Sequence, residues 1–276
     1  MSSWIALRVR ASAGERRDDV VRALFDAGSL GVQEDGDWSV THFPSDTAID
    51  DVRSAVLRAD PGAELRTERT PDVDWSEAWR DQLHLHSLGA LTVAPPWLAD
   101  GLDPARTIVI EPGMAFGTGE HPTTRGVVRL MQDVIRDGDR VADLGAGSAV
   151  LAIAAAKLGA ASVAAIELDP DAIGDAEENA RRNGVAHRVS VICGDAMLLL
   201  PLVAPVRVVL ANIISSVIAQ LLPAVARALE PDGRVILAGI LREEQPHMAS
   251  VLRAGGWRVV AEDVEDIWWS ATVARS

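Results

Sequence analysis

From about residue 105 onward, short apolar runs alternate regularly with runs of helical periodicity. The strand candidates are TIVIE, RVADL, SVAAIEL, RVSVIC, RVVLANI and RVILAGI, and helical runs separate most of them. Such alternation needs crossover connections, which place parallel strands side by side and cover both faces of the sheet with helices. The pattern predicts an α/β fold built on a doubly wound, mostly parallel sheet.

The end of the chain departs from this alternation. After a predicted helix around residues 242–254, two extended pieces, GWRVVAEDV and DIWWSATVA, follow each other with no helix between them. Two consecutive strands without a crossover pair as a hairpin. The sheet is therefore expected to have an antiparallel C-terminal edge.

The first 70 residues carry a different pattern. Ile5, Leu7 and Val9 recur with a period of two, and helical spacing follows over residues 20–27 and again over 49–59. Strand candidates lie at 30–32 and 38–43, with Asp35-Gly36 as the turn, and at AELRTERT. The order β-α-β-β-α-β predicts a small α+β ferredoxin-like domain over residues 1–70, which we interpret as a recognition module.

The remaining boundaries follow from this division. Trp75 and Trp79 lie four residues apart in TPDVDWSEAWR, so they share one face of a predicted linker helix over residues 71–88. Residues 89–276 then form the second domain. A chain of 276 residues is long enough for two separate cores.

Composition limits the partners and the compartment. The net charge of −14 disfavours nucleic-acid binding and suits a basic protein partner, although a solvated acidic surface explains it equally well. The lone cysteine, Cys193, excludes a disulfide framework and fits a reducing compartment. No signal peptide and no apolar run long enough for a membrane span is present, so we expect a cytoplasmic protein without membrane contact.

The stretch VADLGAGSA, residues 141–149, is a strand that enters a glycine turn and then a helix. Glycines allow a ligand to approach the backbone, and the helix start offers free N–H groups. Glu167 follows 22 residues after Gly145, where a βαβ unit places a carboxylate for ribose hydroxyls. The pattern predicts a nucleoside-cofactor pocket that fits either a nicotinamide dinucleotide or a methyl donor.

Two polar residues at later strand ends favour the methyl donor. Asp195 follows RVSVIC and is placed to accept from the exocyclic amine of adenine, and Asn212 ends the next strand, where its carbonyl can face an amine. The alternative for each residue is that it caps the following helix.

The segment EPGMAFGTGEHPTTR, residues 111–125, predicts a lid with Phe116 as its aromatic residue and Thr123 or Thr124 as a helix cap. His121 is a candidate general base, but a structural role at the helix entry is favoured. His84, His86 and His121 have no Cys or carboxylate at ligand spacing, so no metal site is expected.

The combination of AFGTGEHPTTR, VADLGAGSAVLAIAAAKLGA, IELDPDAIGDAEENARRNGV and LANI resembles the bacterial ribosomal protein L-eleven methyltransferases, which are class I enzymes. The resemblance covers nearly the whole chain and implies S-adenosylmethionine as cofactor. Its implied cofactor contacts, with those of class I enzymes in general, fall on Thr124, Asp143, Gly145, Gly147, Glu167, Asp195 and Asn212. One departure is Ala149 where the family has a third glycine: its methyl costs little at negative φ and crowds the ligand if φ is positive.

The resemblance implies a protein N-methyltransferase that modifies lysine side-chain or N-terminal amines of a basic large-subunit ribosomal protein. We expect catalysis by positioning and desolvation, with Asn212 orienting the amine and Phe116 excluding water. The alternatives are a lysine methyltransferase of another protein, a small-molecule N-methyltransferase, a non-catalytic module that binds a ribosomal protein, and a nicotinamide-dependent oxidoreductase.

Overall fold

The structure is a computed structural model that describes residues 4–12, 16–29, 31–44, 47–69, 83–113 and 116–276. The chain divides into two compact units, Met1–Gln82 and Leu83–Ser276. Each unit has its own hydrophobic core. Residues 71–82 of the predicted linker helix, which include Trp75 and Trp79, lie outside the described residues.

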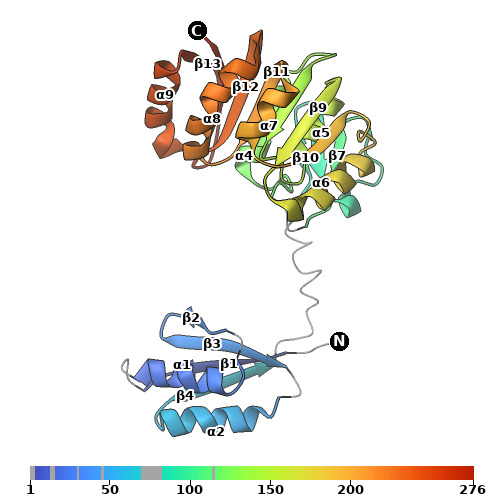
Figure 1. Ribbon diagram of the computed structural model, residues 1–276. Coiled ribbons are helices and arrows are strands. Elements are labelled where there is room, and N and C mark those ends of the chain that lie inside the picture. Colours follow the sequence, from blue (N-terminus) through green and yellow to red (C-terminus); the bar gives the residue numbers. More distant parts are fainter. Residues whose placement is uncertain (1–3, 13–15, 30, 45–46, 70–82, 114–115) are drawn as a thin grey trace. The chain divides into compact units, whose positions relative to one another are not determined.

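The N-terminal unit has the predicted order of elements (Figure 1). Its four strands form one sheet in the order β2-β3-β1-β4, and all neighbours are antiparallel. The elements are β1 (Trp4–Arg10), α1 (Arg17–Asp26), β2 (Gln33–Asp35), β3 (Trp38–Pro44), α2 (Ile49–Ala59) and β4 (Glu64–Arg69).

One strand of this unit lies later in the chain than the sequence predicted. We expected a strand at 30–32, whereas β2 spans Gln33–Asp35 and pairs Asp35 with Trp38 across the turn. The two residues between them, Gly36 and Asp37, make the connection, and Gly36 has a φ of +59°. A two-residue turn fixes the register of a hairpin, so the pairing begins directly beside it.

The C-terminal unit is built on a seven-stranded sheet in the order β10-β9-β8-β11-β12-β14-β13 (Figure 1). The strands β8 to β12 run parallel to one another, and β14, antiparallel to β12, forms with β13 the predicted antiparallel edge. The strands are β8 (Arg140–Leu144), β9 (Ser162–Glu167), β10 (Val189–Cys193), β11 (Val206–Asn212), β12 (Leu229–Leu241), β13 (Trp257–Glu265) and β14 (Trp268–Arg275).

Helices cover both faces of this sheet, as the alternation of elements predicted. Consecutive residues of β11 enter opposite cores: Val208 and Leu210 belong to one cluster, Val209 and Ala211 to the other. Residues of α4 (Pro122–Met131), α5 (Val150–Lys157) and α6 (Pro170–Arg182) join the first cluster, and residues of α7 (Ala196–Val203), α8 (Ser215–Ala228) and α9 (Gln245–Ala254) the second. The unit therefore has three layers, α/β/α.

The beginning of this unit departs from the prediction in two respects. TIVIE was expected in the large sheet, but β7 (Thr107–Val109) pairs with β6 (Leu91–Ala94) in a separate three-stranded sheet. His86–Leu88 is strand β5 of that sheet, rather than the end of the linker helix. Periodicity identifies a buried strand but carries no information about its pairing partner.

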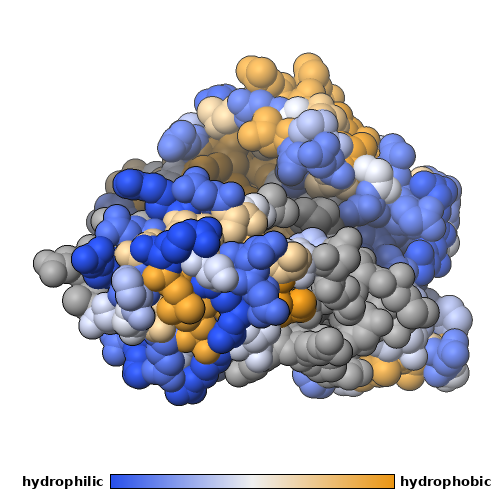
Figure 2. Space-filling model, turned by 90° about the horizontal axis from the view of Figure 1, so that it is seen from below, coloured by the Kyte–Doolittle hydropathy of each residue, from blue (hydrophilic) through white to orange (hydrophobic). Residues whose placement is uncertain are grey.

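Hydrophilic residues predominate on the face that Figure 2 shows, interrupted by apolar patches. None of the helices in the described part of the chain combines the length and the apolar run that a bilayer span requires.

Candidate active site

The candidate site lies where the chain order in the sheet reverses. The chain goes from β8 outward to β10 and then returns to β11, which pairs with β8 on its other side. In open α/β sheets, ligands bind beyond the carboxyl ends of the strands at such a point. A cavity of about 540 Å³ lies there, and it is lined by six of the predicted site residues: Phe116, Gly145, Gly147, Glu167, Asp195 and Asn212.

The glycine turn has the backbone that a close ligand requires. Gly145 has a φ of +74° and Gly147 a φ of +51°, both in the left-handed region that favours glycine. A Cβ at Gly145 would lie 2.5 Å from Ile213 Cγ2, and one at Gly147 would lie 2.4 Å from the Phe116 carbonyl oxygen. Neither position has room for a side chain, which leaves the backbone facing the cavity.

Ala149 follows this turn and also has a positive φ, of +64°. The sequence left negative and positive φ open for Ala149, and the structure has positive φ, which is strained for an alanine. Its methyl group, however, is fully buried in the core cluster that contains Val150 and Ile153, and Ala149 is not among the cavity-lining residues. The methyl group therefore does not crowd the cavity.

Glu167 ends β9 beside the turn. Its Oε2 accepts a hydrogen bond of 2.8 Å from the Gly147 N–H, and its Oε1 accepts one of 2.9 Å from the Asp169 N–H. These bonds hold the carboxylate at the cavity wall. Each oxygen retains a lone pair, so the carboxylate can also accept from ligand hydroxyls.

Asp195 and Asn212 occupy the next two strand ends. Asp195 is the N-cap of α7, where its Oδ1 accepts a bond of 2.8 Å from the Met197 N–H, and it lines the cavity as well. Asn212 is not a cap: the N-cap of α8 is Ile214, and Asn212 Nδ2 lies 3.4 Å from Thr124 Oγ1. With its amide nitrogen directed at Thr124, its carbonyl oxygen is left as an acceptor.

Thr124 and Asp143, two other predicted cofactor contacts, do not line the cavity. Both are fully buried, and Thr124 reaches the cavity only through Asn212. Asp143 Oδ2 accepts a bond of 3.0 Å from the Ala152 N–H, whereas its Oδ1 has no partner among the described residues. Burial, with a smaller contribution from the charge of Glu167, raises the pKa of Asp143 to about 7.

The lid is bonded to the glycine turn. The Phe116 carbonyl accepts from the Ser148 N–H at 2.9 Å, and the Gly117 carbonyl accepts from Ser148 Oγ at 2.7 Å. Asn179 Nδ2 donates to the Ser148 carbonyl, and Asn179 Oδ1 accepts from the N–H of Glu111 at the start of the lid. The sequence analysis did not identify Ser148 or Asn179, whose polar atoms become informative only when their partners are known.

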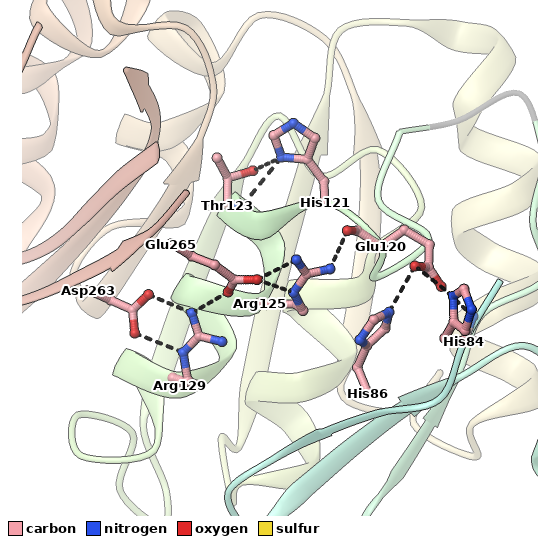
Figure 3. Close-up of polar contacts among 9 residues, drawn as sticks. All are labelled: His84, His86, Glu120, His121, Thr123, Arg125, Arg129, Asp263 and Glu265. Carbon is pink, nitrogen blue, oxygen red and sulfur yellow. Dashed lines mark hydrogen bonds and ion pairs between the residues drawn. The ribbon is translucent and has the colours of Figure 1, made fainter. Parts of the chain in front are cut away.

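A polar network holds the other end of the lid (Figure 3). Glu120 accepts a bond of 2.6 Å from the His84 N–H, and its carboxylate lies 2.9 Å from His86 Nε2. Although burial opposes it, these contacts lower the pKa of Glu120. Arg125 donates to the Glu120 carbonyl and to Glu265 at the end of β13. The lid is thereby tied to α4 and to the hairpin of β13 and β14.

Arg129, one turn further along α4, completes the network in Figure 3. It donates to both carboxylate oxygens of Asp263, at 2.8 and 2.6 Å, and to Glu265 at 2.7 Å. The hydrogen bond with Asp263 raises the pKa of the guanidinium, and Glu265 contributes in the same direction. Fork-shaped pairs of this kind are among the strongest charge-assisted hydrogen bonds.

His121 has the structural role at the helix entry that the sequence favoured. It is the N-cap of α4, and its Nδ1 accepts from the Thr123 N–H at 3.3 Å and lies 2.7 Å from Thr123 Oγ1. Burial, together with the nearby charge of Arg125, lowers the pKa of His121. A neutral imidazole that accepts at Nδ1 carries its proton on Nε2 and has no free lone pair for a general base.

The cavity also has an apolar wall that the sequence analysis did not list. Leu168 and Met197 follow the ends of β9 and β10, and Ile213 and Ile214 follow Asn212. They could have been found among the first few residues after each strand end, because this edge carries the ligand site. In the described ranges, no group of three or more His, Cys, Asp or Glu side chains has an arrangement that could hold a metal ion.

Comparison with known proteins agrees with this geometry. Residues 33–276 match the protein family described as ribosomal protein L11 methyltransferase (PrmA). The ribosomal protein L11 methyltransferase of Thermus thermophilus is 37% identical over 257 residues, which cover 92% of this chain and 93% of that protein. The enzyme of the same name from Pelotomaculum thermopropionicum is 40% identical over 216 residues, covering 78% of this chain and 70% of that protein.

Among solved structures, the ribosomal protein L11 methylase of Lactobacillus delbrueckii subsp. bulgaricus superposes with a TM-score of 0.62 at 30% identity, covering 70% of this chain and 98% of that one. Fold and sequence thus agree with each other over most of the chain. On these grounds, the protein belongs to the ribosomal protein L11 methyltransferase family.

Proposed function

We propose that this protein is an S-adenosylmethionine-dependent N-methyltransferase whose substrate is ribosomal protein L11, modified at lysine side-chain or N-terminal amines. The family match over residues 33–276 carries this proposal. The cavity supports it, because the glycine turn, Glu167, Asp195 and Asn212 all line one space of about 540 Å³. We place the enzyme in the cytoplasm, where its substrate is synthesised.

The residues present fit the cofactor. Glu167 has carboxylate lone pairs for ribose hydroxyls, and Asp195, after the next strand, lines the same cavity and can accept from the exocyclic amine of the adenine. The side-chain-free positions Gly145 and Gly147 leave room for the amino-acid part. When bound, S-adenosylmethionine supplies a methyl group made electrophilic by its sulfonium. Asp143 and Thr124, buried behind this wall, support it through Ala152 and Asn212.

The remaining task of the chain is to present a neutral amine. A lysine of ordinary pKa costs about 4–5 kcal/mol to deprotonate at pH 7, and an α-amine only about 1. Phe116 at the mouth of the cavity excludes water and thereby favours the neutral amine. The Asn212 carbonyl accepts an amine N–H and orients the lone pair. We assign no general base, since His121 is committed at Nδ1.

The N-terminal unit is inferred to recognise the protein substrate. The described residues that line the cavity all come from the C-terminal unit, so we assign the chemistry to this unit. The net charge of −14 suits a basic protein partner, and no contact with nucleic acid or membrane is invoked.

Replacement of Asn212 by alanine tests the proposed mechanism. We expect a loss of about 10- to 100-fold in the rate of L11 methylation at saturating S-adenosylmethionine, the worth of one or two hydrogen bonds in the transition state. Gln220→Ala is the matched control, because Gln220 is an exposed amide that lines the same cavity. Full turnover of Asn212→Ala would contradict the role given to Asn212.

The substrate is tested with S-adenosylmethionine labelled in the methyl group and an extract of cells that lack this enzyme. We expect the label on the small basic protein L11. A different labelled protein would identify another substrate, and no label at all would favour a non-catalytic binding module.

A further inference from the structure

Three aromatic rings stand in a row beside the cavity. The Phe116 and His121 rings lie 5.3 Å apart between centroids, with an interplanar angle of 61°. The His121 and Trp268 rings lie 4.8 Å apart at 65°. Edge-to-face contacts of this kind fix the rings relative to one another. The row joins the lid to the first residue of β14.

The register of the sheet places this row on the side of the cavity that carries Asn212. Asn212 pairs with Ala238 of β12, and Trp268 pairs with Leu241 three residues further along the same strand. Trp268 is half-buried, and Phe116 is 56% exposed and lines the cavity. Glu167 ends β9 and Asp195 follows β10, and both strands lie on the far side of β8 from β11. The rings therefore lie on the side of the cavity where we expect the acceptor amine, beside Asn212.

The charges around the row suit a cationic group. Arg125 and Arg129 donate to two carboxylates in the network of Figure 3, those of Asp263 and Glu265, while the Glu120 carboxylate faces His84 and His86. The two arginines are thus neutralised by two carboxylates. His121 presents a neutral ring, because its Nδ1 lone pair is used by Thr123.

The same network holds the row in place. Arg125 joins the Glu120 carbonyl, one residue before His121, to Glu265, three residues before Trp268. Hydrogen bonds thus tie the described residues on both sides of His121 and Trp268 to α4.

We propose that Phe116, His121 and Trp268 form the acceptor-amine subsite and bind the methylated ammonium group that transfer produces through cation–π contacts. This inference rests on the proposed methyltransferase function. Before each transfer the ammonium group loses one proton to solvent water. The lone pair that this frees forms the N–C bond while the C–S bond breaks with its electron pair going to sulfur. The product amine is again a cation with more methyl groups, which aromatic faces bind well.

The test measures binding rather than turnover. The probes are two L11-derived peptides, one with trimethyllysine and one with its uncharged isostere, in which a tert-butyl group replaces the trimethylammonium. Binding to the full-length protein saturated with S-adenosylhomocysteine is followed by calorimetry. We expect the cationic peptide to bind on the order of 10-fold more tightly, as a desolvated cation–π contact provides.

Variants identify the ring that is responsible. Trp268→Leu should abolish the preference for the cation, and Trp268→Phe should retain most of it. Ile267→Ala is the matched control, because Ile267 is 62% exposed and precedes Trp268 in the same turn. Cofactor affinity should stay the same in all three, which shows that each protein is folded.

Equal affinity of the wild-type protein for both peptides would overturn the inference, as would an unchanged preference in Trp268→Leu. Methyl transfer from labelled S-adenosylmethionine to L11 by the wild-type protein is measured in parallel. Transfer without the preference refutes only the aromatic subsite, whereas absence of transfer refutes the proposed function itself.

Discussion

Ala149 shows how one residue reconciles strain with packing. Its φ of +64° costs an alanine about 1–2 kcal/mol relative to glycine. In return, its methyl group is fully buried in the core beneath the glycine turn. Burial of one methyl is worth about 0.8 kcal/mol, and alanine also restricts the unfolded chain by about 0.4–1 kcal/mol. The cost of the backbone strain and the combined gain from burial and from restriction of the unfolded chain nearly cancel.

Ala149→Gly should therefore change the free energy of unfolding by less than about 1 kcal/mol and leave cofactor affinity within about twofold. Ala154→Gly, at an equally buried position inside α5, is the control and should cost about 2 kcal/mol. Chemical denaturation and calorimetric titration measure the two quantities. A large gain in affinity for Ala149→Gly would mean that the methyl group does crowd the cofactor.

Asp143 is the residue whose ionisation should be visible in stability. Its pKa is raised to about 7 by burial, so between about pH 4 and pH 7 the folded protein keeps a proton that the unfolded chain releases. Stability then falls as the pH rises through this range and levels off above it. The cofactor-free protein is thus expected to be less stable at pH 8 than at pH 5 on account of this group.

Asp143→Asn removes this titration. From pH 5 to pH 8 the wild-type protein should lose about 3 kcal/mol of unfolding free energy that the variant keeps. The size follows from the two pH units between pH 5 and the pKa of about 7, over which the folded protein holds a proton that the unfolded chain has released. Denaturant titrations at both pH values measure it. Asp171→Asn, at an exposed carboxylate, should show no such growth. A constant difference for Asp143→Asn would rule out the raised pKa.

At the level of elements, α4 organises the site. Its N-cap is His121, its first turn carries Thr124, and its outer face carries Arg125 and Arg129. Through these residues the helix touches the lid, Asn212 and the β13–β14 hairpin. The side chains of Arg125 and Glu265 are 14% and 27% exposed, so solvent screens their ion pair only in part.

Glu265→Gln should lower the free energy of unfolding by about 1–3 kcal/mol, because it leaves two partly buried guanidinium groups short of a charged acceptor. Although burial opposes it, bonds from Arg125 and Arg129 lower the pKa of Glu265. The stabilising effect of this carboxylate is therefore present above its ordinary pKa and is lost as the pH falls through the lowered value. The variant and the wild type should converge in acid.

The control for this prediction is Arg106→Gln. The Arg106–Asp103 pair is 3.9 Å long with side chains 71% and 59% exposed, and a pair of this kind contributes little. Thermal unfolding of both variants between pH 3 and pH 7 provides the comparison. Equal stabilities of Glu265→Gln and wild type at pH 7 would show that the network does not hold the hairpin.

At the scale of the whole molecule, we expect the C-terminal unit to carry out methyl transfer and the N-terminal unit to recognise the protein substrate. The cavity and its supporting networks lie within Leu83–Ser276. The N-terminal unit has an independent core, which includes Leu7, Leu24 and Phe43.

A chain consisting of residues 83–276 should bind S-adenosylmethionine as the full protein does but lose most of its methylation of L11, by about 100-fold or more if the missing interface is worth some 3 kcal/mol. Equilibrium binding and labelled methyl transfer measure the two effects, with cooperative thermal unfolding as the control for folding. Undiminished methylation by the shortened chain would contradict the recognition role.

Much of this arrangement could be predicted from the sequence. The alternation of strands and helices, the glycine turn and the final hairpin depend on neighbouring residues, and each was recovered where it was expected. Two predicted strands differ from the structure: β2 begins later in the chain, and β7 belongs to the three-stranded sheet. Both differences depend on pairing with partners that local patterns do not specify. Five predicted site residues meet in one cavity because they lie at strand ends, and Phe116 joins them from the lid, whereas Thr124 and Asp143 lie behind the cavity.

The sequence by itself determined the order of elements, the ligand edge of the sheet and the kind of residue at each strand end, since periodicity and turn chemistry act over a few residues. Only the tertiary structure decided which distant side chains meet. It committed His121 to the start of α4, joined Glu120 to His86 and Arg125 to Glu265, and aligned Phe116 with Trp268. Such contacts depend on the packing of segments far apart in the chain, and that packing cannot be predicted from local sequence patterns.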